Sequence, residues 1–341
     1  MAFFEFSAVK TRYYHHGRLH VEGGVLPDAI TAYRTYGEPK NPCIVFPTCY
    51  GGRLDSQASF VGPNKIIDPE KYFVVTFALF SNGELSLKYT PYNGPYFPKV
   101  SYEDNIRAQH KVLEHLGIQK VHLVIGFSMG GQQAYYWAVM YPDVVERFVS
   151  LSTVSLACAS EPLHLHSFID GPRSALLASV DYQEGHYTSP PQRGIRALAR
   201  AYCPWAYGQT FFREKKYLMN GQFPDLNSFM REHWEAGMLL WDANDLVTLF
   251  HTWEMGDVSK MCDHGGLAKC LAGITAKGLI MPCKTDLYFT PEDSEYEVAC
   301  MPNTAKLAVI PSVWGHIAGN GSNPDDFEFM KAEIQKFLEE A

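Results

Sequence analysis

The sequence predicts an α/β protein in which a mostly parallel, doubly wound sheet is covered by helices and carries an inserted helical cap. Short apolar, β-branched runs alternate with segments of helical periodicity through the first half of the chain, as in parallel sheets with helical crossovers. The alternation stops after Thr153 and resumes near residue 278, with helical patterns between them. We therefore expect a sheet domain formed by residues 1–154 and 271–341, with residues 155–270 as the cap.

Strands are expected wherever a short apolar run rich in β-branched or aromatic residues occurs in the first half. A helix is expected after the third run, because Ile106, Val112 and Leu116 recur at helical spacing. A second helix is expected in the segment QQAYYWAVMY. The expected strands cover residues 29–36, 42–47, 72–79, 148–152 and the apolar run that starts at Val121.

The cap and the C-terminal part are predicted from the same periodicities. Aromatic residues crowd the segment 202–253, and most of them are expected to form the cap's own core. Phe327, Met330, Ile334 and Phe337 mark one apolar face of a C-terminal helix. The expected elements are helices at 193–202, 226–234, 243–255 and 325–340, and strands at 278–284 and 306–310.

Composition and charge exclude several classes of protein. A formal net charge of −8, without a long basic run, argues against nucleic acid as a partner. No apolar run reaches the roughly 18 residues of a membrane span, and the N-terminal segment lacks the pattern of a signal peptide. The eight cysteines show no Cys-x-x-Cys spacing. We therefore expect free thiols in a reducing cytoplasm, with neither a disulfide framework nor a metal site.

The strongest functional signal is the segment GFSMG, in which Ser128 stands between Gly126 and Gly130. It follows an apolar strand and precedes a helix, which is the context of a nucleophile elbow. The turn is so tight that the flanking positions must carry almost no side chain. We therefore predict that Ser128 is a catalytic nucleophile, and the alternative is a glycine turn without a catalytic role.

A serine nucleophile needs a base, and the base needs an acid that orients it. In folds with this elbow, the acid and then the histidine follow the serine in loops after late strands. Asp286 follows the strand expected at 278–284, and His316 follows the next one. Glu292 and Asp293 compete with Asp286, but they follow a proline and suit the first turn of a helix. The cap histidines that compete with His316 are His164, His166, His186, His251 and His264.

The oxyanion hole is expected to combine two backbone amides. One belongs to Met129, directly after the nucleophile, and the other to the glycine-containing loop TCYGG after the strand at 42–47. Tyr50 is the predicted second donor, with Cys49 as the alternative. Cys49 is not predicted to be a nucleophile, because no base accompanies it.

With these motifs in place, the chain resembles the homoserine O-acetyltransferase family of the α/β-hydrolase superfamily. The resemblance runs from AYRTYG and the glycine loop through FPKVSYEDNIRAQHKVLEHLGI and GFSMGGQQAYYWAVMYPD to the late TDLYFTPE and GH loops. It implies an α/β-hydrolase fold, an acyl-serine formed from acetyl-CoA, and a homodimer built through the cap. It also implies that Ser128, Asp286 and His316 form the catalytic triad.

The resemblance further implies a carboxylate-binding pair in the cap, an arginine followed seven positions later by a tyrosine. Arg200 and Tyr207 have this spacing, and a guanidinium can hold a carboxylate through two hydrogen bonds. The alternative is a surface arginine on a cap helix. The family has an aspartate directly after the catalytic histidine, where this chain has Ile317, and the segment 80–96 also departs from the family pattern. An apolar side chain cannot pair with the ammonium group of homoserine.

The sequence therefore predicts a serine-nucleophile enzyme that acts on a small molecule and needs no cofactor. Hydrolysis of an ester or related carbonyl compound is favoured, because the acceptor's ammonium partner is missing. The alternative is an O-acyltransferase that uses acyl-CoA as co-substrate. A non-catalytic ligand-binding module is a further alternative, disfavoured because serine, acid, histidine and glycine loop occur together.

Overall fold

The computed structural model describes residues 9–84, 94–156, 166–262 and 265–340. His164 and His264 of the sequence analysis lie outside these ranges, as do Cys158, one of the eight cysteines, and nine residues of the segment 80–96.

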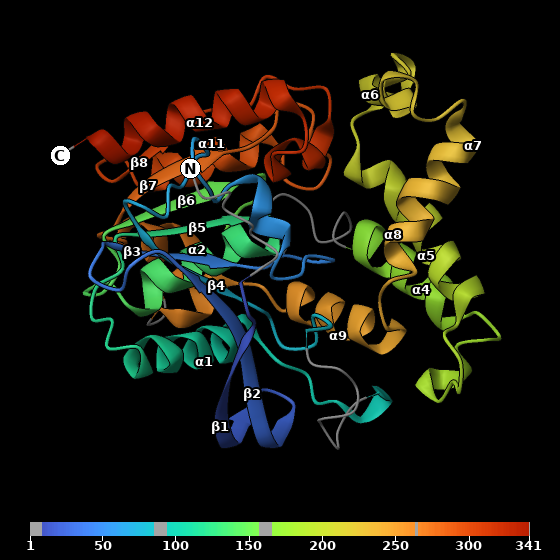
Figure 1. The fold of residues 1–341 in the computed structure, drawn as a ribbon, viewed down its shortest axis with the longest axis horizontal. Helices are drawn as coiled ribbons and strands as arrows, with labels where there is room; N and C mark the ends of the chain where they lie inside the picture. The colour runs from blue at the N-terminus through green and yellow to red at the C-terminus, as the bar shows by residue number, and fades with distance from the viewer. Residues whose placement is uncertain (1–8, 85–93, 157–165, 263–264, 341) are drawn as a thin grey trace.

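An eight-stranded sheet forms the centre of the molecule, in the order β1-β2-β4-β3-β5-β6-β7-β8 (Figure 1). The pairs β1–β2 and β2–β4 are antiparallel, and the pairs from β4 onward are parallel. The predicted mostly parallel α/β sheet is thus confirmed. The strands are β1 (Arg12–Val21), β2 (Gly24–Tyr36), β3 (Cys43–Pro47), β4 (Phe73–Phe77), β5 (Leu123–Phe127), β6 (Arg147–Leu151), β7 (Lys277–Met281) and β8 (Ala305–Leu307).

Helices cover both faces of this sheet, which explains why its central strands are apolar throughout. Every residue of β3 and β4 is buried. On one face, Met330, Ile334 and Phe337 of the C-terminal helix pack with alternate strand residues. On the other face, two helices that follow β4 and β5 pack with the remaining ones. The covering helices are α1 (Tyr102–His115), α2 (Met129–Met140), α11 (Pro291–Cys300) and α12 (Pro324–Glu339).

The described chain between β6 and β7 contains helices joined by turns and no named strand, and most of these helices lie to one side of the sheet in Figure 1. The helix expected at 226–234 is a short α-helix continued by a π-helix, Met230–Glu235. The α-helices here are α4 (Gly171–Leu177), α5 (Gln192–Ala206), α6 (Gln209–Arg213), α7 (Leu226–Phe229), α8 (Ala236–Met238), α9 (Ala243–Glu254) and α10 (Gly266–Ala272).

Strand β1 is an element that the sequence pattern did not predict. It pairs with β2 through a tight turn at Glu22 and Gly23, and its register shifts on both sides of Gly17. These irregularities break the alternation of apolar and polar residues that marks an ordinary strand. The glycine pair that follows Glu22 was the available hairpin signal.

The expectation that all cysteines are free thiols is wrong for one pair. A disulfide joins Cys262 and Cys270, whose Cα atoms lie 5.6 Å apart. The eight-residue spacing matches no sequence motif; Cys262 directly follows a 3-10 helix (Val258–Met261), and Cys270 lies within α10. The thiols of Cys43, Cys49, Cys203, Cys283 and Cys300 are free.

Within the described part of the chain, we find no helix with the length and apolar character needed to cross a bilayer.

Candidate active site

Ser128 occupies a strained turn between β5 and α2. Its backbone has φ 55° and ψ −126°, in the left-handed half of conformational space that non-glycine residues rarely adopt. The turn brings the start of α2 against the end of β5, so that a Cβ atom on Gly126 would lie 2.1 Å from the carbonyl carbon of Gly130. The sequence thus needs glycine at 126 for the serine to be presented in this way.

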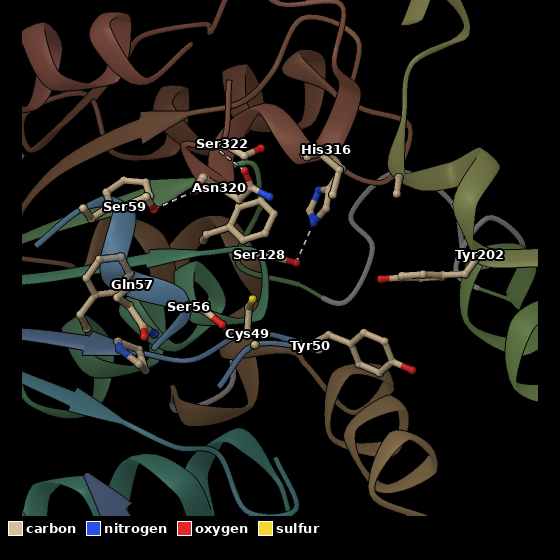
Figure 2. Close-up of a pocket in the computed structure, with 18 of the residues that line it drawn as sticks. Cys49, Tyr50, Ser56, Gln57, Ser59, Ser128, Tyr202, His316, Asn320 and Ser322 are labelled. Atoms are coloured by element: carbon tan, nitrogen blue, oxygen red, sulfur yellow. Dashed lines mark hydrogen bonds between the residues drawn. The ribbon is translucent and has the colours of Figure 1, made fainter. Parts of the chain in front are cut away.

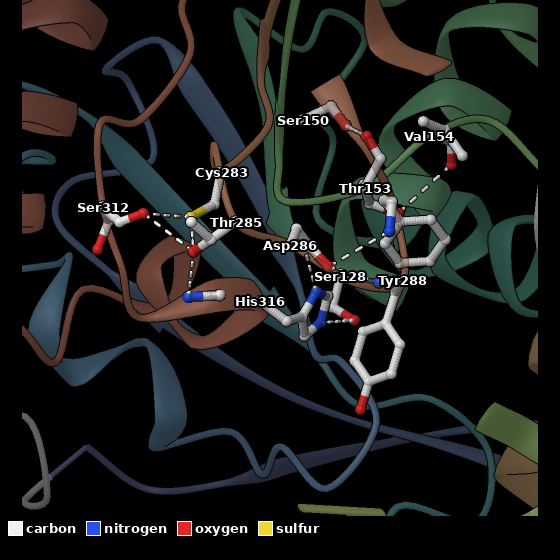
Figure 3. A network of polar contacts seen from close by, with 12 residues as sticks. Ser128, Ser150, Thr153, Val154, Cys283, Thr285, Asp286, Tyr288, Ser312 and His316 are labelled. Atoms are coloured by element: carbon white, nitrogen blue, oxygen red, sulfur yellow. Dashed lines mark hydrogen bonds and ion pairs between the residues drawn. The ribbon is translucent and has the colours of Figure 1, made fainter. Parts of the chain in front are cut away.

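Ser128, His316 and Asp286 form a hydrogen-bonded series (Figure 3). Nε2 of His316 lies 2.8 Å from Oγ of Ser128, and Nδ1 lies 2.8 Å from Oδ2 of Asp286. All three residues are buried. A carboxylate only accepts hydrogen bonds, so Nδ1 carries the proton and Nε2 is left to accept from the serine hydroxyl.

Two loops hold the acid and the histidine. Oδ1 of Asp286 accepts hydrogen bonds from the backbone amides of Tyr288 (2.8 Å) and Phe289 (3.3 Å). The Thr285 hydroxyl accepts from the amide of Gly315 at 3.1 Å, which links the residues directly before Asp286 and His316 (Figure 3). These hydrogen bonds fix the orientation of the Asp286 carboxyl group independently of its contact with His316.

Two competing carboxylates and one competing histidine have other partners in the described structure. Glu292 is exposed, and Asp293 lies in the first turn of α11, where it interacts with the Thr290 side chain. His251 of α9 contacts Arg173 of α4 and Glu254 of its own helix.

The predicted oxyanion donors lie on the two segments that approach Ser128. Tyr50 lines the same cavity as Ser128, and Met129 is the first residue of α2. Neither backbone amide is paired with an acceptor among the described residues. The lack of a protein acceptor is what an oxyanion hole requires of its two donors. The thiol of Cys49 lines the cavity too, and burial raises its pKa to about 12, which leaves it protonated and a poor nucleophile.

A cavity of about 390 Å³ opens at Ser128 and His316. Figure 2 shows polar side chains on one side of Ser128 and Tyr202 on the other. The described lining contains no Asp, Glu, Lys or Arg, and it includes the apolar Ile317. The lining residues besides the glycine loop and the triad are Phe46, Pro47, Ser56, Gln57, Ser59, Phe60, Phe127, Tyr202, Ala206, Trp234, Met238, Asn320 and Ser322.

The structure does not bring Arg200 and Tyr207 to this cavity, which corrects the expected carboxylate clamp. Nε of Arg200 lies 2.6 Å from Oε1 of Glu235, and the arginine side chain is half exposed. Tyr207 is buried among aromatic rings, and its ring stacks on that of Phe211 with the two ring centroids 4.1 Å apart. Arg200 lies on the face of α5 opposite Leu198, while Tyr202 and Ala206 of the same helix reach the cavity.

Sequence reasoning also missed the polar side of the cavity. Ser56, Gln57 and Ser59 belong to a short 3-10 helix, and Asn320 ends the 3-10 helix that carries His316. The Ser59 hydroxyl donates to the Asn320 carbonyl at 3.3 Å, which joins the two segments. Their only signal in the sequence was closeness to the glycine loop and to His316.

A fully buried carboxyl group lies behind the nucleophile helix. Glu297 of α11 accepts hydrogen bonds from the hydroxyl of Tyr135 at 2.6 Å and from the amide of Ser155 at 2.7 Å. Ser155 lies just after β6, where the chain leaves the sheet for the helical segment. Burial raises the pKa of Glu297 from 4.5 to about 7.

We expect Glu297 to make the protein less stable as pH rises from 4.5 to about 7. The folded state retains a proton that the unfolded chain has already lost, so each pH unit in this window lowers the unfolding free energy by up to about 1.4 kcal/mol. Glu297→Gln should remove this slope. Urea unfolding at pH 5, 6 and 7 checks it, with the exposed Glu295→Gln as control. Parallel pH curves for wild type and Glu297→Gln would contradict the assignment.

Comparisons with known proteins agree with this architecture. A family model described as alpha/beta hydrolase fold matches residues 80–183. The chain is 29% identical to the ethyl acetate hydrolase of Pseudomonas veronii, over 93% of this chain and 92% of that protein. It is 27% identical to the homoserine O-acetyltransferase of Trichormus variabilis, again over 93% and 92%.

A solved structure is also similar to this chain over nearly its whole length. The acetyl esterase MekB superposes on the chain with a TM-score of 0.90 at 29% identity, covering 97% of each chain. The resemblance seen in the sequence therefore extends over nearly the whole length and the whole fold. The chain therefore has the α/β-hydrolase fold, and it is similar over nearly its whole length to esterases as well as to homoserine O-acetyltransferases.

Proposed function

We propose that this protein hydrolyses small, uncharged esters through an acyl-enzyme formed on Ser128. The observation that carries the proposal is the series Asp286–His316–Ser128, hydrogen-bonded at 2.8 Å in both links and placed at a cavity whose described lining contains no Asp, Glu, Lys or Arg. A ligand-binding module would not need such a series.

In the acylation step, the Ser128 hydroxyl gives its proton to Nε2 of His316 while Oγ bonds to the ester carbonyl carbon. The carbonyl oxygen becomes an oxyanion that the amides of Met129 and Tyr50 stabilise. Asp286 stabilises the imidazolium that forms. When the tetrahedral intermediate collapses, the ester C–O bond breaks and His316 protonates the departing alkoxide.

Deacylation repeats these steps with water. His316 accepts a proton from a water molecule, whose oxygen attacks the acyl carbon. The bond to Oγ of Ser128 then breaks, and the serine oxygen takes the proton back from His316. The carboxylic acid leaves, and the enzyme returns to its starting state.

The cavity lining supports a neutral substrate. An anionic or cationic group would lose its hydration in this cavity without a charged partner, which is costly. Ile317 occupies the position where the family pairs an aspartate with an ammonium group. The similarity to ethyl acetate hydrolase, which acts on such an ester by its name, supports the same substrate class.

O-acyl transfer from acyl-CoA is the second candidate, supported by the similarity to homoserine O-acetyltransferase. One experiment separates the two. The enzyme is incubated with ethyl acetate, and separately with acetyl-CoA and homoserine, and the products are quantified by mass spectrometry. We expect acetate release from the ester and no O-acetylhomoserine. Formation of O-acetylhomoserine at a higher kcat/KM than ester hydrolysis would overturn the proposal.

We further propose that the protein acts without a cofactor in the cytoplasm, as a homodimer joined through the helical cap. Exposed apolar side chains on the segment between β6 and β7 support the assembly, because they would be covered by a second copy. Sedimentation velocity tests it by separating a 38.4 kDa monomer from its dimer. The side chains are Leu177, Val180, Leu226 and Leu240.

A further inference from the structure

A single buried amide group connects the two segments that carry the proposed oxyanion donors. Nε2 of Gln133 lies 2.9 Å from the carbonyl oxygen of Thr48 and 3.0 Å from that of Met129. Thr48 begins the glycine loop that contains Tyr50, and Met129 follows the nucleophile. Gln133 is fully buried and does not line the cavity. Its amide is therefore placed to set the separation of the two segments.

The orientation of this amide is determined by its neighbours. The indole N–H of Trp137, which can only donate, lies 2.9 Å from Oε1 of Gln109. Nε2 of Gln109 must then point away from Trp137 and toward Gln133, and it donates to Oε1 of Gln133 at 2.7 Å. This leaves Nε2 of Gln133, with its two hydrogens, toward the two carbonyls. Each group in the series has one role, and successive hydrogen bonds strengthen one another.

The far side of the glycine loop is held independently. The Thr48 hydroxyl accepts from the amide of Leu79 and from the side chain of Asn82, both at 3.1 Å. Asn82 also donates to the Gly52 carbonyl at 3.2 Å, at the other end of the loop. Hydrogen bonds thus attach the loop to β4 and its following turn on one side, and the Gln133 side chain attaches it to α2 on the other.

We propose that Gln133 is a positioning residue that sets the geometry of the oxyanion hole. The proposal rests on the function proposed above, since it concerns the stabilisation of the tetrahedral intermediate. The Thr48 carbonyl belongs to the peptide that carries the Cys49 amide, directly before the Tyr50 amide. Its hydrogen bond to Gln133 therefore orients the loop amides relative to Met129. Small displacements of such donors reduce transition-state stabilisation while substrate binding changes little.

Gln132 provides a matched control. It is the neighbouring residue, equally buried, and it also forms hydrogen bonds, with the hydroxyl of Tyr102 and the carbonyl of Leu156. These partners lie on α1 and just after β6, and neither is a residue of the glycine loop. Methionine at 132 or 133 removes the amide at similar volume. A general loss of stability should lower the activity of both variants. A distorted oxyanion hole should lower the activity of Gln133→Met alone.

The experiment compares Gln133→Met, Gln132→Met and Gln109→Met with wild type. We measure kcat and KM for p-nitrophenyl acetate, and the inhibition constant of a trifluoromethyl ketone, whose adduct with Ser128 carries an oxyanion. In Gln133→Met we expect kcat to fall by roughly ten- to hundredfold, KM to change less than threefold, and inhibition to weaken by the same factor as kcat/KM. The pH midpoint of kcat/KM should stay unchanged, because the histidine is untouched.

Gln109→Met should show a smaller decrease of the same kind, since it removes only the group that orients Gln133, and it provides the readout if Gln133→Met does not fold. Gln132→Met should retain kcat and inhibitor affinity within threefold. Equal losses in the variants at 132 and 133, or a KM effect without a kcat effect, would overturn the proposal. Wild type without esterase activity and without reaction of Ser128 with a fluorophosphonate would instead overturn the proposed function.

Discussion

Ser128→Ala is expected to lower kcat for ester hydrolysis by about a thousandfold or more while the protein remains folded. In the proposed mechanism the hydroxyl oxygen bonds to the carbonyl carbon, and this oxygen lies 2.8 Å from Nε2 of His316, the proposed base. Removal of a triad nucleophile leaves only the contribution of binding and of the oxyanion hole. Steady-state kinetics and reaction with a fluorophosphonate measure the effect.

Ser152 is a matched control for this substitution. It is another fully buried serine with positive φ, 46°, and it follows β6, the strand next to β5. Ser152→Ala, like Ser128→Ala, places alanine at a position with positive φ at the carboxyl edge of the sheet. It leaves the hydrogen bond between Ser128 and His316 intact. We expect Ser152→Ala to retain most activity. More than a tenth of wild-type activity in Ser128→Ala would contradict the nucleophile assignment.

The tight turn at Ser128 and the meeting of Ser128, Asp286 and His316 could be predicted because each depends on local sequence or on simple topology. The glycines around Ser128 are required by a turn that the sequence itself displays between an apolar strand and a helix. Asp286 and His316 follow consecutive strands, and parallel strands place their carboxyl ends at one edge of the sheet. The structure brings the three side chains together from residues 188 positions apart in the chain.

The cap side of the cavity could not be predicted in the same way. The seven-residue spacing of Arg200 and Tyr207 does not determine which face of α5 packs against the neighbouring helices. That face is selected by packing of Ile195, Leu198 and Tyr202, all buried, and it leaves Arg200 to pair with Glu235. A helix-face analysis of α5 would have indicated Tyr202 rather than Arg200.

Asp286→Asn is expected to lower kcat by roughly a thousandfold with little change in KM. Oδ1 of Asp286 accepts from the amides of Tyr288 and Phe289, so the carbonyl oxygen of an asparagine will take that position. Its NH₂ group then faces Nδ1 of His316, where Oδ2 now lies at 2.8 Å. Nδ1 must become the acceptor, and the proton moves to Nε2.

The imidazole in that tautomer cannot accept the proton of Ser128, and the charge that stabilises the imidazolium is also lost. Because neither effect involves substrate contacts, the loss should appear in kcat and not in KM. Asp293→Asn and Glu292→Gln are the controls, since both carboxylates lie in the first turn of α11. They should alter kcat less than threefold. A larger decrease in kcat from either control than from Asp286→Asn would assign the orienting acid to α11 and remove Asp286 from the triad.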